Sequence, residues 1–143
     1  MNDLIKAEDI LKAGGCGLVF VCGGKIIKRD GRGIAPLLEL VESGEELKDF
    51  CVADKIVGKA AALLYAYAGV SAVYGEVMSV SAECVFKEHG IAYCCGEKTE
   101  KIINRTGDGL CPMETAVQSI SSPQEAVTAL RKKVDSLRGV KSD

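Results

Sequence analysis

The sequence predicts an α/β protein, a three-layer α-β-α sandwich with a mixed sheet, and two observations predict it. Two apolar runs, 17–22 and 25–28, flank the dipeptide Gly23-Gly24, which is typical of an antiparallel β-hairpin. Farther along, strand and helix patterns alternate from residue 50 to residue 95, which predicts parallel strands joined by helices. A sheet with both kinds of pairing satisfies both patterns.

Length and composition agree with one folded unit. The 143 residues fit a single domain, with a core expected at residues 3–137 and a frayed tail at 138–143. Hydrophobic residues make up 48% of the chain and charged residues 27%, which excludes wholesale disorder. The formal net charge of -2 excludes a general polyanion-binding surface, so we expect no nucleic-acid partner.

The first elements are predicted from apolar spacing and helix stop signals. Residues 3–13 form an amphipathic helix, with Asp3 as its cap and Gly14-Gly15 as its stop. After the hairpin, Pro36 suits the first turn of a helix that ends at Ser43-Gly44. A glycine-rich loop therefore joins the hairpin to this helix.

The central segments alternate between strand and helix. Residues 50–53 form a short buried strand, and the alanine-rich segment 56–68 forms a tightly packed helix that ends at Gly69. Residues 70–77 form the next strand, 79–89 a helix with Ser79 or Ser81 as its cap, and 91–95 a further strand. These segments predict a parallel, right-handed β-α-β unit.

The last third of the chain is expected to be helical after a long loop. Residues 97–109 are polar and contain glycine, which predicts a loop. Pro112 then opens a helical segment, and Ser122-Pro123 opens a final helix that runs through Leu137.

No targeting or membrane segment is predicted. The N-terminus lacks the apolar run of a secretory signal, and the most apolar stretch, 56–73, is interrupted by Gly58, Lys59 and Gly69. Seven cysteines in a chain with its own core are expected to be reduced. We therefore expect a cytoplasmic protein without a membrane partner.

One candidate binding site is the segment 54–59, which is expected to run from a strand end into a helix N-terminus. Free backbone N–H groups at such a start favour anions, and strand ends in α/β sheets form crevices. Asp54, Lys55, Gly58 and Lys59 are the candidate binding residues for a phosphate or carboxylate. The alternative is a helix end with two solvated lysines.

A second candidate is the polar loop at residues 104–114. Cys111 is expected beside a helix N-terminus, a position that favours a reactive thiolate. Asp108 and Glu114 are candidate acid or base groups in the same loop. The alternative is a well-capped surface loop with a packed cysteine.

The cysteines do not predict a zinc site. The chain contains no Cys-x-x-Cys pair and one histidine, His89, which precedes Gly90 at an expected helix end. A cation is favoured there by the helix dipole, so His89 is expected to be a dipole partner rather than a metal ligand. We expect no metal and no cofactor.

The order of these segments resembles a small prokaryotic family of uncharacterised domains with the cytidine deaminase-like fold. The resemblance extends from about Gly17 to Val117. It rests on Asp54-Lys55-Ile56-Val57-Gly58-Lys59-Ala60-Ala61-Ala62, Glu76-Val77-Met78-Ser79, Gly90-Ile91, Asn104-Arg105 and Cys111-Pro112-Met113-Glu114.

This resemblance implies a deaminase-like scaffold without its metal. Zinc-dependent deaminases begin one helix with His/Cys-x-Glu and the next with Pro-Cys-x-x-Cys. Here Gly58-Lys59-Ala60 and residues 78–82 stand at about those positions, and Cys84 comes too late on its helix to replace a ligand. Zinc-dependent deamination is therefore not expected.

What the resemblance leaves is a crevice between two helix starts, near residues 56–59 and 79–81. We expect a metal-free domain that binds a small anionic or nucleotide-related ligand in this crevice. The lining residues are expected to be Lys55, Lys59, Ser79 and Ser81, with Asn104, Arg105, Asp108, Cys111 and Glu114 brought over them by the long loop.

Two alternatives to ligand binding remain open. One is an enzyme without zinc that uses Cys111 as nucleophile, or Lys55 or Lys59 as a desolvated amine. The other is an interaction protein that forms a homodimer, because relatives of this fold commonly assemble.

Overall fold

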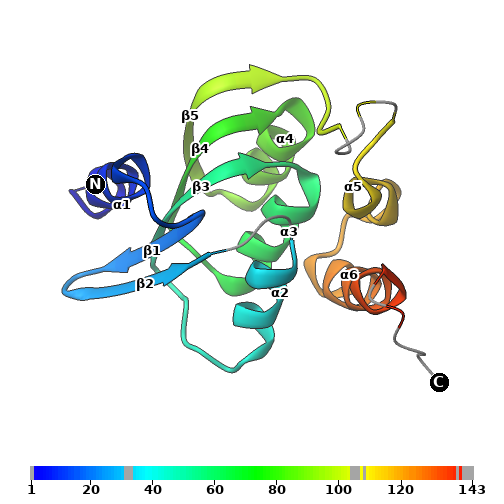
Figure 1. The fold of residues 1–143 in the computed structure, drawn as a ribbon, viewed down its shortest axis with the longest axis horizontal. Helices are drawn as coiled ribbons and strands as arrows, with labels where there is room; N and C mark the ends of the chain where they lie inside the picture. Colours follow the sequence, from blue (N-terminus) through cyan, green and yellow to red (C-terminus); the bar gives the residue numbers. More distant parts are fainter. Residues whose placement is uncertain (1, 31–33, 104–106, 108, 138, 140–143) are drawn as a thin grey trace.

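The computed structural model describes residues 2–30, 34–103, 107, 109–137 and 139. The elements follow in the order α1 (Asn2–Ala13), β1 (Leu18–Cys22), β2 (Lys25–Arg29), α2 (Ala35–Glu42), β3 (Cys51–Val57), α3 (Lys59–Ala68), β4 (Ala72–Ser79), α4 (Val80–His89), β5 (Ala92–Thr99), α5 (Pro112–Ala116) and α6 (Pro123–Leu137). The strands form one sheet in the order β2-β1-β3-β4-β5 (Figure 1).

The sheet is mixed, as the sequence predicts. β1 pairs antiparallel with β2 across the Gly23-Gly24 turn, and it also pairs antiparallel with β3. β3, β4 and β5 are parallel and are joined by α3 and α4. The hairpin and the parallel β-α-β unit are therefore both confirmed.

Helices cover the two faces of the sheet unevenly. α1 packs on one face, against β1 and β3. α2, α3 and α4 lie on the other face, and α6 packs outside them, against α3 and α2 (Figure 1). The predicted three-layer sandwich is confirmed, with α5 and α6 added outside its thicker helical layer.

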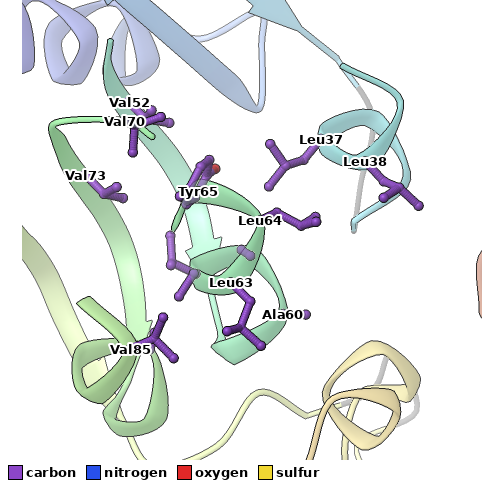
Figure 2. Packing of buried hydrophobic residues seen from close by; sticks show 14 of the residues in the cluster. Leu37, Leu38, Val52, Ala60, Leu63, Leu64, Tyr65, Val70, Val73 and Val85 are labelled. Carbon is purple, nitrogen blue, oxygen red and sulfur yellow. The ribbon is translucent and has the colours of Figure 1, made fainter. Parts of the chain in front are cut away.

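The larger core lies between the sheet and α3. Leu63, Leu64 and Tyr65 have no exposed surface, and Figure 2 shows them on α3 among residues of the sheet, α2 and α4. Burying side chains of this size contributes ~1.5–3 kcal/mol each. The alanines at the start of α3 are also buried, and their small side chains let the helix lie close to its neighbours.

The helix ends agree with the predicted stop and start signals. Gly69 and Gly90 end α3 and α4 in the left-handed conformation, with φ of 79° and 69°. Pro36 lies in the first turn of α2, and α5 begins at Pro112. In the described part of the chain, no helix combines the length and apolarity needed to cross a bilayer.

The sequence predictions around residues 54–59 are wrong in one respect. β3 extends to Val57, and α3 begins at Lys59, not at Ile56. Asp54 and Val57 both face α3, although strict alternation would place them on opposite faces. The strand therefore twists at Lys55 and Ile56. Because the alternation of side chains is interrupted there, the sequence pattern did not predict that the strand continues to Val57.

Two further predictions need correction. β5 runs from Ala92 to Thr99, four residues beyond the predicted end at Cys95, because register with β4 holds it in the sheet through Thr99. Asp3 is not a helix cap: it lies within α1, and its carboxylate accepts a hydrogen bond from the N–H of Gly23 at 3.0 Å. Most of the predicted tail at 138–143 lies outside the described residues.

Candidate functional site

Two helices begin side by side at the carboxyl edge of the parallel strands. Val57 of β3 and Met78 of β4 are partners in the parallel register. The next residues, Gly58 and Ser79, are the N-caps of α3 and α4. The backbone N–H groups of both helix starts therefore lie at one edge of the sheet, where α/β proteins commonly bind ligands.

The start of α3 is occupied by the carboxylate of Glu114. Its two oxygens accept hydrogen bonds from the backbone N–H groups of Lys59 and Ala60, each at 2.8 Å. Gly58 makes this approach possible, since a Cβ on it would lie 2.5 Å from Glu114 Oε1. Glu114 therefore lies over Lys59, as the sequence analysis expected. The crevice is not open at this point, however, because this carboxylate of the same chain satisfies the free donors.

Lys59 also ties α3 to the segment that follows α5. Its ammonium group donates a hydrogen bond to the carbonyl oxygen of Gln118 at 3.1 Å. Together with the contacts of Glu114, this bond holds the α5 region against the α3 N-terminus. The Lys59 amine is thus engaged in a structural contact.

The start of α4 is capped by its own serines. Ser79 is completely buried, and its hydroxyl accepts a hydrogen bond from the N–H of Ala82 at 3.1 Å. The hydroxyls of Ser79 and Ser81 lie 3.2 Å apart. The structure therefore brings these two predicted residues together, and of the two candidate caps it is Ser79 that caps α4.

Asp54 lies farther back, within β3. Its carboxylate accepts a hydrogen bond from the hydroxyl of Tyr65 at 2.5 Å. Burial raises the pKa of Asp54 to about 6, although the Tyr65 hydroxyl and the N–H groups of Ile56 and Lys55 lower it. Burial, and next the Asp54 charge, also raise the pKa of Tyr65 well above its usual value of 10.0.

The predicted grouping of Asp54 and Lys55 at a helix start is therefore wrong. Both residues belong to β3, and Lys55 is exposed. Asp54 is paired with Tyr65 of α3, a residue that the sequence analysis did not select. No spacing rule links a strand aspartate to a tyrosine in the last turns of the following helix, so this contact had no sequence signal.

Cys111 is the N-cap of the five-residue helix α5 and lies partly buried against the main core. Its backbone N–H donates to the carbonyl of Ile102 at 3.0 Å, next to a β-bridge between Ile103 and Leu110. The hydrogen bond and the bridge hold together the two ends of the loop that connects Ile103 to Leu110. The predicted residues of that loop, Asn104, Arg105 and Asp108, lie outside the described residues.

The residues at the two helix starts do not fit a zinc ion. Backbone N–H groups and hydroxyls point into this edge of the sheet, and the nearby carboxylate is already bound to two of them. The described residues contain no group of three or more His, Cys, Asp or Glu that could hold a metal. All seven cysteines are free thiols, and Cys84 is exposed on α4.

Two surface hollows lie away from this edge. One, of about 180 Å³, is lined by Val41, Gly44, Glu45, Glu46, Leu47, Tyr67 and Ala68. The other, of about 350 Å³, is lined by Arg29, Asp30, Pro36, Glu39, Leu40 and Ser43. Neither is lined by a residue that the sequence analysis proposed for a binding or catalytic site.

Comparison with known protein families shows to which family the chain belongs. Residues 6–134 match the TM1506 family, described as a domain of unknown function (DUF1893). The chain belongs to the DUF1893 family. The resemblance to a family of uncharacterised domains is thereby confirmed.

The DUF1893 domain is also similar to solved structures. The crystal structure of the DUF1893 protein TM1506 from Thermotoga maritima has 27% sequence identity and a TM-score of 0.84, over 92% of this chain and 90% of that chain. The dCMP deaminase of cyanophage S-TIM5, in apo form, has 17% identity and a TM-score of 0.45, over 68% of this chain and 94% of that chain. Comparison with curated proteins gives no significant match.

Proposed function

We propose that this DUF1893 domain binds a small anionic ligand, without a metal, where α3 begins. The observation that supports it is the bidentate contact of the Glu114 carboxylate with the N–H groups of Lys59 and Ala60. Two backbone donors in this arrangement suit the oxygens of a phosphate as well as those of a carboxylate. The site therefore has the donor chemistry of an anion receptor.

In this proposal the carboxylate of Glu114 competes with the ligand for the N–H groups of Lys59 and Ala60. It lies on α5, a short helix held to α3 by these two bonds and by the contact of Lys59 with Gln118. A ligand anion would take the place of the carboxylate and displace it from the N–H groups. Because the carboxylate occupies these N–H groups in the ligand-free chain, the apparent affinity of the ligand would be reduced by the fraction of closed molecules.

Exposed apolar residues beside the helix starts favour a ligand with a ring as well as an anion. Ile56, two residues before the cap of α3, is 55% exposed, and Val80, the first residue of α4, is 43% exposed. Large apolar side chains at such an edge provide a contact for an apolar body. We therefore favour a nucleotide-related ligand whose phosphate replaces the Glu114 carboxylate.

The test is a titration followed by the amide resonances of Lys59 and Ala60. Inorganic phosphate and a nucleoside monophosphate are added to the wild type and to Glu114→Ala. We expect both ligands to shift these two amides, the nucleotide to bind more tightly, and Glu114→Ala to bind each about tenfold more tightly or better, because the competitor is gone.

Glu125→Ala is the matched control, since Glu125 is exposed in the first turn of α6. Its affinity for phosphate should equal that of the wild type. The proposal fails if Glu114→Ala lowers stability yet gains no affinity for either anion, because Glu114 would then be only a helix cap.

A further inference from the structure

The sheet has two edge strands, and they differ in length and charge. β2 has five residues and β5 has eight, and in the described part of the chain no further strand pairs with either outer edge. Figure 1 shows β5 at the rim of the sheet. An edge strand presents unpaired backbone N–H and C=O groups, which other strands can pair with unless something opposes it.

Charge opposes self-pairing at β2 but not at β5. β2 contains Lys25, Lys28 and Arg29, and a two-fold antiparallel pairing over its whole length would set Lys25 opposite Arg29 of a second copy. Like charges directly opposite each other destabilise a strand pair. β5 contains one acid and one base, Glu97 and Lys98, and has no net charge.

We propose that two copies of this chain pair antiparallel through β5, about a two-fold axis, and so continue the sheet from one copy into the other. Pairing over the full strand sets Cys94 opposite Glu97 of the second copy and Tyr93 opposite Lys98 of the second copy. No like charges are opposed in this register. The pairing is an isologous contact, in which one surface meets itself.

The side chains of β5 suit this register. Tyr93 stacks on Phe86 at 5.7 Å between ring centroids, and Lys98 pairs with Glu83 at 3.2 Å. Both partners belong to α4, so Tyr93 and Lys98 lie on the same face of the sheet. Across the axis, each lysine would therefore meet a tyrosine ring, which is a favourable cation–π arrangement.

At the centre of the proposed contact, Cys95 would lie opposite Gly96 of the second copy. The missing side chain of Gly96 is explained within its own sheet, because a Cβ there would lie 2.9 Å from the carbonyl oxygen of Glu76 in β4. Cys94 is exposed, so its side chain is available on the surface in the single chain. This contact does not involve the start of α3 and is independent of the proposed ligand site.

The test changes the charge at position 94, because the proposed register places this residue opposite Glu97 of the second copy. Cys94→Glu sets a carboxylate opposite Glu97 of the second copy, twice in each dimer, whereas Cys94→Lys sets an ammonium there. We expect a wild-type dimer, at least about tenfold weaker dimerisation for Cys94→Glu, and a retained dimer for Cys94→Lys. Sedimentation equilibrium under reducing conditions measures each.

The double variant Cys94→Glu with Glu97→Lys restores opposite charges and should restore the dimer. Circular dichroism and melting confirm that each variant is folded. A monomeric wild type at the highest soluble concentration overturns the proposal. So does equal dimerisation of Cys94→Glu and Cys94→Lys, or loss of the dimer on Ile26→Glu in β2, since the contact would then lie elsewhere.

Discussion

Asp54 shows how one buried carboxyl group can set the pH response of this domain. Its carboxylate bonds to the Tyr65 hydroxyl, and the neighbouring N–H groups of Lys55 and Ile56 also stabilise the charge. Lys55 lies where β3 departs from strict alternation, and its pairing with Glu76 is missing from an otherwise continuous register.

The raised pKa of Asp54 predicts a loss of stability as the pH rises. With the pKa raised from 3.8 to about 6, the carboxyl stays protonated in the folded chain while it ionises in the unfolded chain. The free energy of unfolding should therefore fall by roughly 3 kcal/mol between about pH 4 and pH 6, and then level off. Asp54→Asn should remove this fall, as measured by urea unfolding across that range.

Asp9→Asn is the control, because Asp9 is an exposed aspartate of α1. Its stability should follow the wild-type pH curve. If Asp54→Asn keeps the wild-type slope in this window, the burial of the carboxyl does not govern the response.

The start of α3 depends on an element far away in the sequence. Gly58 supplies no capping side chain, and Glu114 of α5 provides the acceptors that the first N–H groups need. The backbone of Gly58 is extended, with φ of -104° and ψ of -171°, a conformation that other residues also adopt. Glycine is needed here because it has no side chain, which leaves room for the Glu114 carboxylate. α3 and α5 are therefore stabilised as a pair.

This pairing predicts that Gly58→Ala and Glu114→Ala are not additive. The added methyl would displace the carboxylate, so each single variant should lower the free energy of unfolding by ~1–2 kcal/mol. The double variant should be little worse than Glu114→Ala alone, since the methyl then has room. Urea unfolding of the four proteins measures the coupling.

Gly24→Ala is the matched control, because a Cβ on Gly24 would meet nothing within 4 Å. It should change the free energy of unfolding by about 0.5 kcal/mol or less. Additive losses in the double variant would mean that Gly58 and Glu114 act separately.

At the scale of the whole molecule, parallel strands and their helices bring distant segments to one edge. β3 and β4 end at the same level, so the caps of α3 and α4 become neighbours. α6 packs on α3 and α2, with Ala126, Leu130 and Val134 buried, and supports the α3 layer from outside. The site is thus a product of the complete layer arrangement.

This arrangement predicts that zinc neither binds nor stabilises the domain. The helix starts present positively polarised N–H groups, which disfavour a cation. Purified protein should contain no stoichiometric metal by elemental mass spectrometry, and its melting temperature should not change with EDTA or added zinc. One bound zinc per chain, with a lower melting temperature after chelation, would contradict the structure at this edge.

The sequence by itself determined the local elements, because periodicity, turn residues and caps act over a few neighbours. The Gly23-Gly24 hairpin, a serine cap at the start of α4 and the helix ends at Gly69 and Gly90 were all predicted in this way. The mixed sheet followed from the order of these elements, and the family from the motifs. A local rule also placed Ser79 and Ser81 at the start of α4, where their hydroxyls lie 3.2 Å apart.

Only the tertiary structure decided what happens at the helix starts. The contacts of Glu114 with Lys59 and Ala60 join residues 55 and 54 positions apart, and the contact of Asp54 with Tyr65 joins a strand to a helix. No local pattern specifies such pairs, because they depend on how α5 and α3 pack once the sheet has formed. The free backbone N–H donors at the start of a helix need hydrogen-bond acceptors. At the α3 start, the packing of α5 against α3 provides the carboxylate of Glu114 as that acceptor.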